Sequence, residues 1–219
     1  MIKRILIIGF GMMGKSHLYS FINSKHKYQI SIYDKKNYSK IEISNYFNKV
    51  NFLKKFPKKK KYDCVIIATS SDIRFLLLKK ILKFNKVNKV ILEKFIFPKI
   101  VQYKKFAKFS ENYKDLILKV NTWGDYLYRN LKLPKNIKNN NVKIFVPEGT
   151  LLSNTIHYLD FCFRKIQKIE INLNLKRIIN SKRNSYHEAL GKISINTSQK
   201  QISIQTSKNK NDKMVFLKG

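Results

Sequence analysis

The sequence predicts an α/β protein with two parts: an N-terminal doubly wound parallel sheet and a smaller, shortened C-terminal α+β domain. Three observations predict this fold class. Isoleucine-rich apolar runs alternate with helix-like segments over residues 1–121, and the connections are long enough to cross over between parallel strands. From residue 122 onward the pattern changes to one helix followed by short alternating segments. We therefore expect domains at residues 1–121 and 122–219.

The first predicted strand, residues 2–8, leads directly into a glycine-rich segment and a predicted helix over residues 12–24. Its apolar character on both faces is typical of a buried parallel strand. The glycines have the G-x-G-x-x-G spacing, in which the first permits a tight turn, the second lets the backbone approach a pyrophosphate, and the third lets the helix pack on the strand. The helix N-terminus favours the phosphates. The loop residues expected at the cofactor are Gly9, Phe10, Gly11, Met12, Met13 and Gly14.

The second predicted strand, Tyr28 to Tyr33, ends in Asp34, twenty positions after Gly14. A carboxylate at this place accepts hydrogen bonds from the adenosine ribose hydroxyls and repels a 2′-phosphate. The order strand, loop, helix, strand and aspartate therefore predicts a Rossmann dinucleotide-binding domain that prefers NAD to NADP. Lys35 and Lys36 follow directly and soften that preference. The alternative is a glycine turn beside an ordinary acidic strand end.

The remaining elements follow from apolar patterning and helix-start signals. In the first domain we expect strands near 50–52, 63–69, 90–94 and 116–120, with helices near 71–84 and 98–112. Residues 129–142 are polar and resemble a linker or loop. The second domain is expected to hold a helix near 150–165 and antiparallel strands near 169–179, 192–196, 201–205 and 214–217.

The charge is strongly positive: 46 lysines and arginines against 13 acidic residues give +33 at pH 7. This balance suggests a nucleic-acid binder, but the positive residues are nearly all lysine, are spread along the whole chain, and accompany many Ile, Asn, Tyr and Phe residues. That combination is typical of AT-rich coding, and the arginines suited to bidentate base contacts are scarce. We expect no specific nucleic-acid partner, a preference for acidic small molecules, and salt-sensitive adhesion to polyanions.

Two cysteines, Cys64 and Cys162, are too few for a disulfide framework, so we expect both to be reduced packing residues in a cytoplasmic protein. The sequence has no apolar segment of the roughly 18 residues that span a bilayer, and we expect no membrane partner. Spacings of His, Cys and carboxylate residues do not predict a metal site.

Four stretches, in order, resemble the Gfo/Idh/MocA family of oxidoreductases. They are the glycine loop through His17, the segment ATSS at 68–71, EKF at 93–95, and GTLLSNTIHYLD at 149–160. The resemblance implies an NAD(P)-binding Rossmann domain and a C-terminal domain whose open sheet often mediates homo-oligomerisation. It also implies hydride transfer between nicotinamide and a carbinol carbon of a sugar, cyclitol or nucleotide sugar. Further cofactor contacts implied in this way are Ala68, Thr69, Ser70, Glu93 and Lys94.

By the same resemblance, Lys94 would polarise or deprotonate the reacting hydroxyl, and His157 would be its acid–base partner or a substrate ligand. A lysine at the carboxyl end of a parallel strand points into the ligand crevice of such a sheet. The alternatives are an ordinary surface lysine and a satisfied structural histidine. Trp123, Ser153 and Asp160 are the candidate substrate residues. Trp123 would stack on a sugar or simply pack, and Asp160 would orient its helix or a neighbouring group.

Departures from the family pattern support a second hypothesis. Ser153 stands where the family has an aspartate, Phe95 replaces a proline, and Arg74 replaces a common histidine. The chain is also shorter than typical members, which suggests a compact subtype or a truncated gene. The alternative function is therefore a catalytically degenerate NAD(P)-binding protein acting as a sensor or subunit. A nucleic-acid binder, supported by charge alone, is a third hypothesis.

Overall fold

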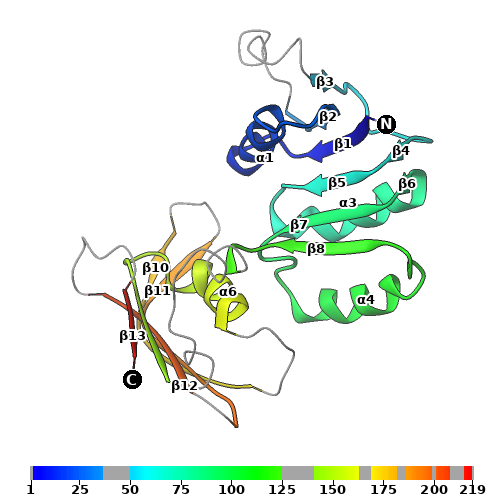
Figure 1. Cartoon of the computed structure of the whole chain (residues 1–219). Helices are drawn as coiled ribbons and strands as arrows, with labels where there is room; N and C mark the ends of the chain where they lie inside the picture. The colour runs from blue at the N-terminus through cyan, green and yellow to red at the C-terminus, as the bar shows by residue number, and fades with distance from the viewer. Residues whose placement is uncertain are drawn as a thin grey trace. The chain divides into compact units, whose positions relative to one another are not determined.

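The computed structural model describes residues 2–36, 50–124, 141–162, 169–181, 186–198 and 201–207, together with the backbone of 215–218. The chain divides into two compact units, Met1–Asn121 and Thr122–Gly219. Each unit has its own sheet and its own apolar core (Figure 1).

The first unit is a six-stranded parallel sheet with the order β3-β2-β1-β5-β7-β8. The chain builds outward from β1 through β2 to β3 and then returns to β5, on the other side of β1. The order therefore reverses between β1 and β5, which is the topological switch point where such sheets bind ligands. This topology confirms the predicted doubly wound sheet. The strands are β1 (Lys3–Ile8), β2 (Tyr28–Tyr33), β3 (Val50–Phe52), β5 (Cys64–Ile67), β7 (Lys89–Glu93) and β8 (Ile117–Asn121).

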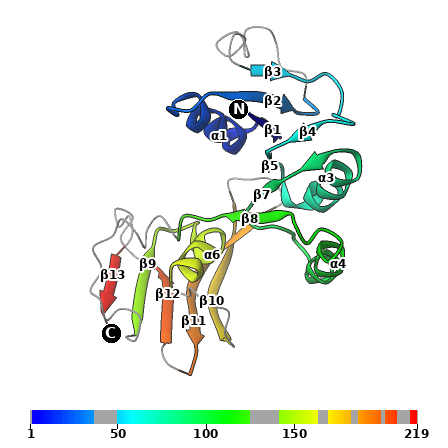
Figure 2. The same ribbon diagram turned by 45° about the vertical axis from the view of Figure 1, so that its right-hand side comes forward.

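Helices cover both faces of this sheet (Figure 2). Alternate residues of β1 enter different cores: Ile5 and Ile7 pack with Leu18 of α1 (Met12–Ile22), whereas Leu6 and Ile8 pack with Leu78 of α3 (Ser71–Phe84). Helix α4 (Ile100–Ser110) adds side chains to the α3 side. Residues Ile5 to Ile8 of β1 are buried on both faces, which explains why this part of the strand reads as a continuous apolar run.

Two details of this unit differ from the sequence-based expectation. The strand predicted at 63–69 ends at Ile67, which leaves residues 68–70 in the loop before α3. A two-stranded parallel ribbon, β4 (Lys61–Tyr62) with β6 (Lys86–Val87), was not predicted because two residues are too few to produce a periodic pattern.

The second unit is a five-stranded sheet with the order β10-β11-β12-β9-β13, and α6 (Leu151–Cys162) packs on one face. The four strands predicted as antiparallel form antiparallel pairs, β10 with β11, β11 with β12, and β13 with β9, but β9 pairs with β12 in parallel, which was not predicted. Strand β9 itself was not predicted; it begins where the expected linker ends, and most of that linker lies outside the described residues. The strands are β9 (Val142–Val146), β10 (Glu170–Asn180), β11 (His187–Asn196), β12 (Gln201–Thr206) and β13 (Val215–Lys218).

Helix length bears on membrane association. Of the helices in the described ranges, none combines the length and apolar character required to cross a bilayer.

Candidate cofactor and catalytic site

The glycine loop connects β1 to α1, and its three glycines meet different surroundings. Gly9 has a φ of +93°, and a Cβ there would lie 2.9 Å from Cγ2 of Thr69. A Cβ on Gly14 would lie 2.0 Å from the carbonyl oxygen of Gly9, so only glycine lets the helix begin this close to the turn. A Cβ on Gly11 would meet nothing within 4 Å. Gly9 and Gly14 therefore serve the packing of the loop, whereas Gly11 presents bare backbone to open space.

Asp34 ties the end of β2 to this loop. Its Oδ2 accepts a hydrogen bond from the Phe10 N–H at 2.5 Å, and its Oδ1 accepts one from the Lys36 N–H at 2.8 Å. The Phe10 ring is buried against Phe52, with centroids 5.3 Å apart. The Phe10 ring is therefore part of the core, and its N–H is bonded to Asp34.

The loop and its surroundings fit a dinucleotide. The first turn of α1 contains no acidic residue, so its N–H groups and positive dipole end are available to an anion. Met12 is exposed and Met13 is half-buried at this helix start. Such a cofactor requires three features, and the site has all of them: open backbone at Gly11, a helix N-terminus, and a carboxylate at the end of the neighbouring strand.

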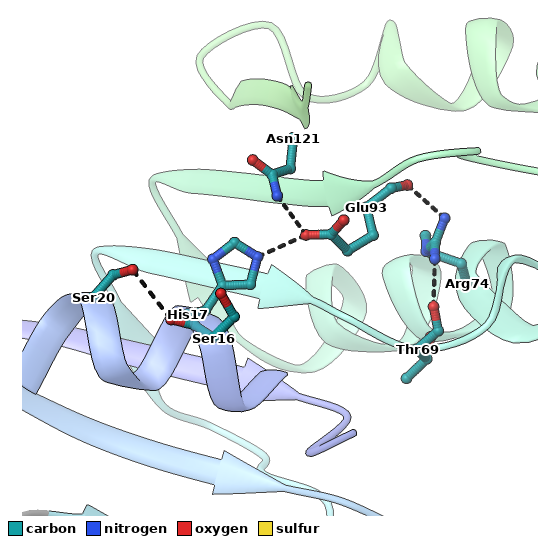
Figure 3. A network of polar contacts seen from close by, with 7 residues as sticks. All are labelled: Ser16, His17, Ser20, Thr69, Arg74, Glu93 and Asn121. Carbon is teal, nitrogen blue, oxygen red and sulfur yellow. Dashed lines mark hydrogen bonds and ion pairs between the residues drawn. The ribbon is translucent and has the colours of Figure 1, made fainter. Parts of the chain in front are cut away.

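Glu93, at the end of β7, is the centre of a buried polar network (Figure 3). Its Oε1 lies 2.6 Å from Nε2 of His17 on α1 and accepts a hydrogen bond from Nδ2 of Asn121 on β8 at 2.7 Å. Burial alone would raise the pKa of Glu93, but these two hydrogen bonds and the charges of His17 and Arg74 outweigh it, so the pKa lies below its usual value. The carboxylate therefore joins α1 to two strands of the sheet.

Arg74 of α3 forms the other half of the network and is 2 % exposed. Its Nη1 donates to the carbonyl oxygens of Glu93 at 2.5 Å and Ile96 at 3.2 Å, and also to that of Phe95. Its Nη2 donates to the carbonyl oxygen of Thr69. Arg74 therefore links the loop after β5 to the loop after β7. The sequence had marked it only as a departure from the family pattern.

The predicted cofactor residues of these two loops lie along the same edge of the sheet. Lys94 follows β7 directly and is partly buried, with its Nζ 5.9 Å from the centroid of the Phe95 ring. The Lys94–Phe95 peptide bond is cis. Ala68, Thr69 and Ser70 form the loop between β5 and α3, with Ser70 at the N-cap position. Since these strands are parallel, their carboxyl ends share the edge that carries the glycine loop.

In the second unit, His157 and Asp160 of α6 contact Thr122 and Trp123, the residues that directly follow β8 in the sequence. Nδ1 of His157 accepts a hydrogen bond from the Trp123 N–H at 3.2 Å, and the two rings stack with centroids 4.4 Å apart. Oδ2 of Asp160 accepts a hydrogen bond from Oγ1 of Thr122 at 2.6 Å. The structure therefore brings Trp123, His157 and Asp160 together. Because Nδ1 is an acceptor, the neutral His157 ring carries its proton on Nε2.

Ser153 lies at the start of α6, where sequence reasoning missed a buried partner. Oε1 of Glu188 accepts a hydrogen bond from the Ser153 N–H at 3.0 Å, and Oε2 accepts one from the Leu152 N–H at 2.8 Å. Glu188 comes from β11 and is buried. A carboxylate thus caps the helix start from another element, which stabilises the exposed N–H groups and the helix dipole.

Over the ranges that the structure describes, no three His, Cys, Asp or Glu side chains gather closely enough to hold a metal ion.

Comparison with known proteins identifies the family. The model of the oxidoreductase family with an NAD-binding Rossmann fold, GFO_IDH_MocA, matches residues 3–121. The chain belongs to this family. A comparison with curated protein sequences gave no match.

Solved structures similar to this chain are oxidoreductases of the same fold. An oxidoreductase from Bacillus cereus has a TM-score of 0.68 and 15% identity, over 98% of this chain and 68% of that one. A dehydrogenase from Clostridium difficile has a TM-score of 0.65 and 13% identity, over 99% and 74%. Biliverdin reductase from Synechocystis sp. PCC 6803, solved with biliverdin and NADP⁺, has a TM-score of 0.59 and 15% identity, over 99% and 79%. At these identities the likeness supports the fold.

Proposed function

We propose that this protein is an NAD-dependent oxidoreductase that transfers hydride between nicotinamide and a carbinol or keto carbon of a sugar, cyclitol or nucleotide sugar. The observation that carries the proposal is the open backbone at Gly11 beside Asp34, on the same sheet edge as Lys94. A family of NAD-binding oxidoreductases supplies the reaction class.

Asp34 supports NAD rather than NADP. Its carboxylate lies at the end of β2 next to the glycine loop, where it would accept hydrogen bonds from ribose hydroxyls and repel a 2′-phosphate. One structural neighbour was solved with NADP⁺, and Lys35 and Lys36 follow Asp34, so the preference is best expressed as a ratio of affinities. A bound nicotinamide would supply the hydride donor or acceptor.

Lys94 is the proposed proton-transfer group. In its amine form, Nζ accepts the hydroxyl proton when the carbinol carbon loses its hydride, and the resulting ammonium returns that proton in the reverse direction. In the second unit, His157 is the candidate acid–base group or substrate ligand. With its proton on Nε2, it is suited to donate a hydrogen bond to a substrate oxygen. Trp123, Ser153 and Asp160 remain the proposed substrate residues.

A second candidate function is a catalytically degenerate NAD(P)-binding sensor or subunit. The observation that favours it is that the motif residues of α6 already make contacts within the protein. His157 is 4 % exposed and stacks on Trp123, and Asp160 accepts a hydrogen bond from Thr122. A histidine buried in this way performs a packing role whether or not it also meets a substrate.

A substrate screen distinguishes the two functions. The purified protein is incubated with NAD⁺ and a panel of polyols, inositols and nucleotide sugars, and NADH formation is followed by absorbance. For a substrate so identified, we expect Lys94→Ala to reduce kcat by about a hundredfold or more. Lys99→Ala, an exposed lysine in the same loop, is the matched control and should leave kcat unchanged. Turnover by Lys94→Ala within a factor of a few would refute the role of Lys94, and NADH binding without turnover of any substrate would favour the degenerate protein.

The proposal extends to location and assembly. We propose a cytoplasmic protein with no membrane or specific nucleic-acid partner, which forms a homo-oligomer through the face of the second sheet that lies opposite α6. That face carries the polar cross-strand pair Asn172 and Ser194. Light scattering after gel filtration measures the assembly, and a monomer at micromolar concentration would contradict it.

A further inference from the structure

We propose that Arg74 is a positioning residue that fixes the backbone on both sides of Lys94 and so sets the direction of the Lys94 side chain. This inference rests on the proposed function, in which Lys94 transfers the proton. Nothing in the family comparison assigns a role to Arg74.

Arg74 forms hydrogen bonds with residues that precede and follow Lys94 in the sequence. Its Nη1 donates to the carbonyl of Glu93, which belongs to the peptide group before Lys94, and to the carbonyl of Phe95, one residue after it. A further bond from Nη1 reaches Ile96 at 3.2 Å. With the carbonyls on either side held by one guanidinium, the Cα–Cβ bond of Lys94 has little freedom to turn.

The residue that follows Lys94 explains why such a restraint is useful. Phe95 stands where the resemblance places a proline, so its φ is not fixed by a ring. It is 40 % exposed, so core packing restrains it little. The Arg74 bonds supply from outside the segment the restraint that proline would supply within it.

An arginine is suited to this task and a lysine is not. The planar guanidinium presents five N–H donors in a fixed fork, whereas an ammonium is a point charge with three rotating donors. Arg74 reaches carbonyls on two different loops at once, and its charge lies close enough to help lower the pKa of Glu93. The Nη1 and Nη2 donors of this buried guanidinium are matched by backbone carbonyl oxygens, and its charge lies near the Glu93 carboxylate.

The same guanidinium connects Lys94 to the glycine loop. Nη2 holds the carbonyl of Thr69, and the Thr69 side chain borders Gly9, where an added Cβ would lie 2.9 Å from Cγ2. Arg74 therefore joins the loops after β5 and β7 directly, and Thr69 brings the first of these loops against the glycine loop. Removing the guanidinium should loosen the Lys94 segment without opening the sheet core.

Hydrogen–deuterium exchange of the full chain, without cofactor, tests the positioning directly. In Arg74→Lys we expect the amides of Phe95 and Ile96 to exchange about tenfold or more faster than in the wild type, while amides of β1 and β5 keep their protection. Lys79→Ala, an exposed α3 lysine, is the matched control and should exchange like the wild type. Arg74→Ala is a second variant. Unchanged exchange at Phe95 and Ile96 in Arg74→Lys would overturn the proposal, and so would an equal rise throughout the chain, which would indicate general destabilisation.

Kinetics supply a readout that a purely structural role would not move. With a substrate from the screen, Arg74→Lys should lower kcat by about tenfold or more and leave the KM for NAD⁺ within about threefold of the wild-type value. A proportional loss of active protein with unchanged kcat per folded molecule would overturn the proposal. If the wild type binds no NADH, the proposed function fails, whereas the exchange experiment still decides whether Arg74 orders the Lys94 segment.

Discussion

At the scale of single residues, two glycines of the loop have different roles, one in packing and the other in ligand binding. Gly14 is required by packing, because a Cβ would lie 2.0 Å from the Gly9 carbonyl oxygen. Gly11 has a φ of −70°, which any residue adopts, and a Cβ there would point into open space. The chain itself therefore does not require glycine at position 11, and the presence of one is best explained by the approach of a ligand.

The two glycines give a matched pair of alanine variants. Gly14→Ala should lower the free energy of unfolding by about 1–3 kcal/mol, because backbone must move to admit the methyl group. Gly11→Ala should leave the free energy of unfolding within about 0.5 kcal/mol of the wild type and weaken NADH binding by about tenfold or more. Urea unfolding and a fluorescence titration measure the two effects. Equal stability losses in both variants, with equal NADH affinities, would contradict this division.

At the scale of elements, the Glu93 carboxylate holds α1 and β8 to the end of β7 through His17 and Asn121. Its pKa is lower in the folded chain than the ordinary value of 4.5. The folded state therefore binds fewer protons than the unfolded state in this range. The stabilisation is complete above about pH 4.5 and is lost as the pH falls through the folded-state pKa.

Glu93→Gln removes this pH dependence. We expect the wild type to exceed the variant in the free energy of unfolding at pH 7, and the difference to shrink as the pH falls below about 4.5. Urea unfolding at several pH values measures it, with Glu111→Gln, an exposed residue at the end of α4, as the control. A difference that grows toward low pH would have the wrong sign for a carboxylate with a lowered pKa.

The start of α6 depends on β11 in a similar way. Glu188→Ala would leave the Leu152 and Ser153 N–H groups without their carboxylate acceptor, at a cost of about 1–3 kcal/mol in the free energy of unfolding. Glu170→Ala, on the exposed β10, is the control and should cost less than about 0.5 kcal/mol. Thermal unfolding followed by circular dichroism compares the two. Equal losses would mean that the cap contributes little.

At the scale of the whole molecule, local patterns predicted the individual strands of the first sheet, the glycine loop and the placement of Asp34, because each of these is encoded within about 35 consecutive residues. Arg74, Asn121 and Glu188 were missed as partners. The bonds from Arg74 and Asn121 to Glu93, and from Leu152 to Glu188, join residues 19 to 36 positions apart, and sequence periodicity does not predict such pairs. The parallel pairing of β9 with β12 was missed for the same reason. From the sequence, Arg74 was noted only as a departure from the family pattern.

The charge of +33 also acts on the molecule as a whole. We expect any affinity for a random DNA duplex to fall by about a thousandfold between about 50 and 200 mM salt, and to be the same for a shuffled sequence. Fluorescence anisotropy measures both. Sequence-selective binding that survives physiological salt would instead favour a nucleic-acid function.

The central claim is that the first unit binds NAD(H) through the glycine loop and Asp34, and calorimetric titration with NAD⁺, NADH and NADPH at moderate salt tests it most directly. We predict micromolar binding with NADH preferred to NADPH, and loss of that preference in Asp34→Asn, because the variant no longer repels a 2′-phosphate. Failure of the wild type to bind any of the three nucleotides would contradict the account and the enzymatic function proposed from it.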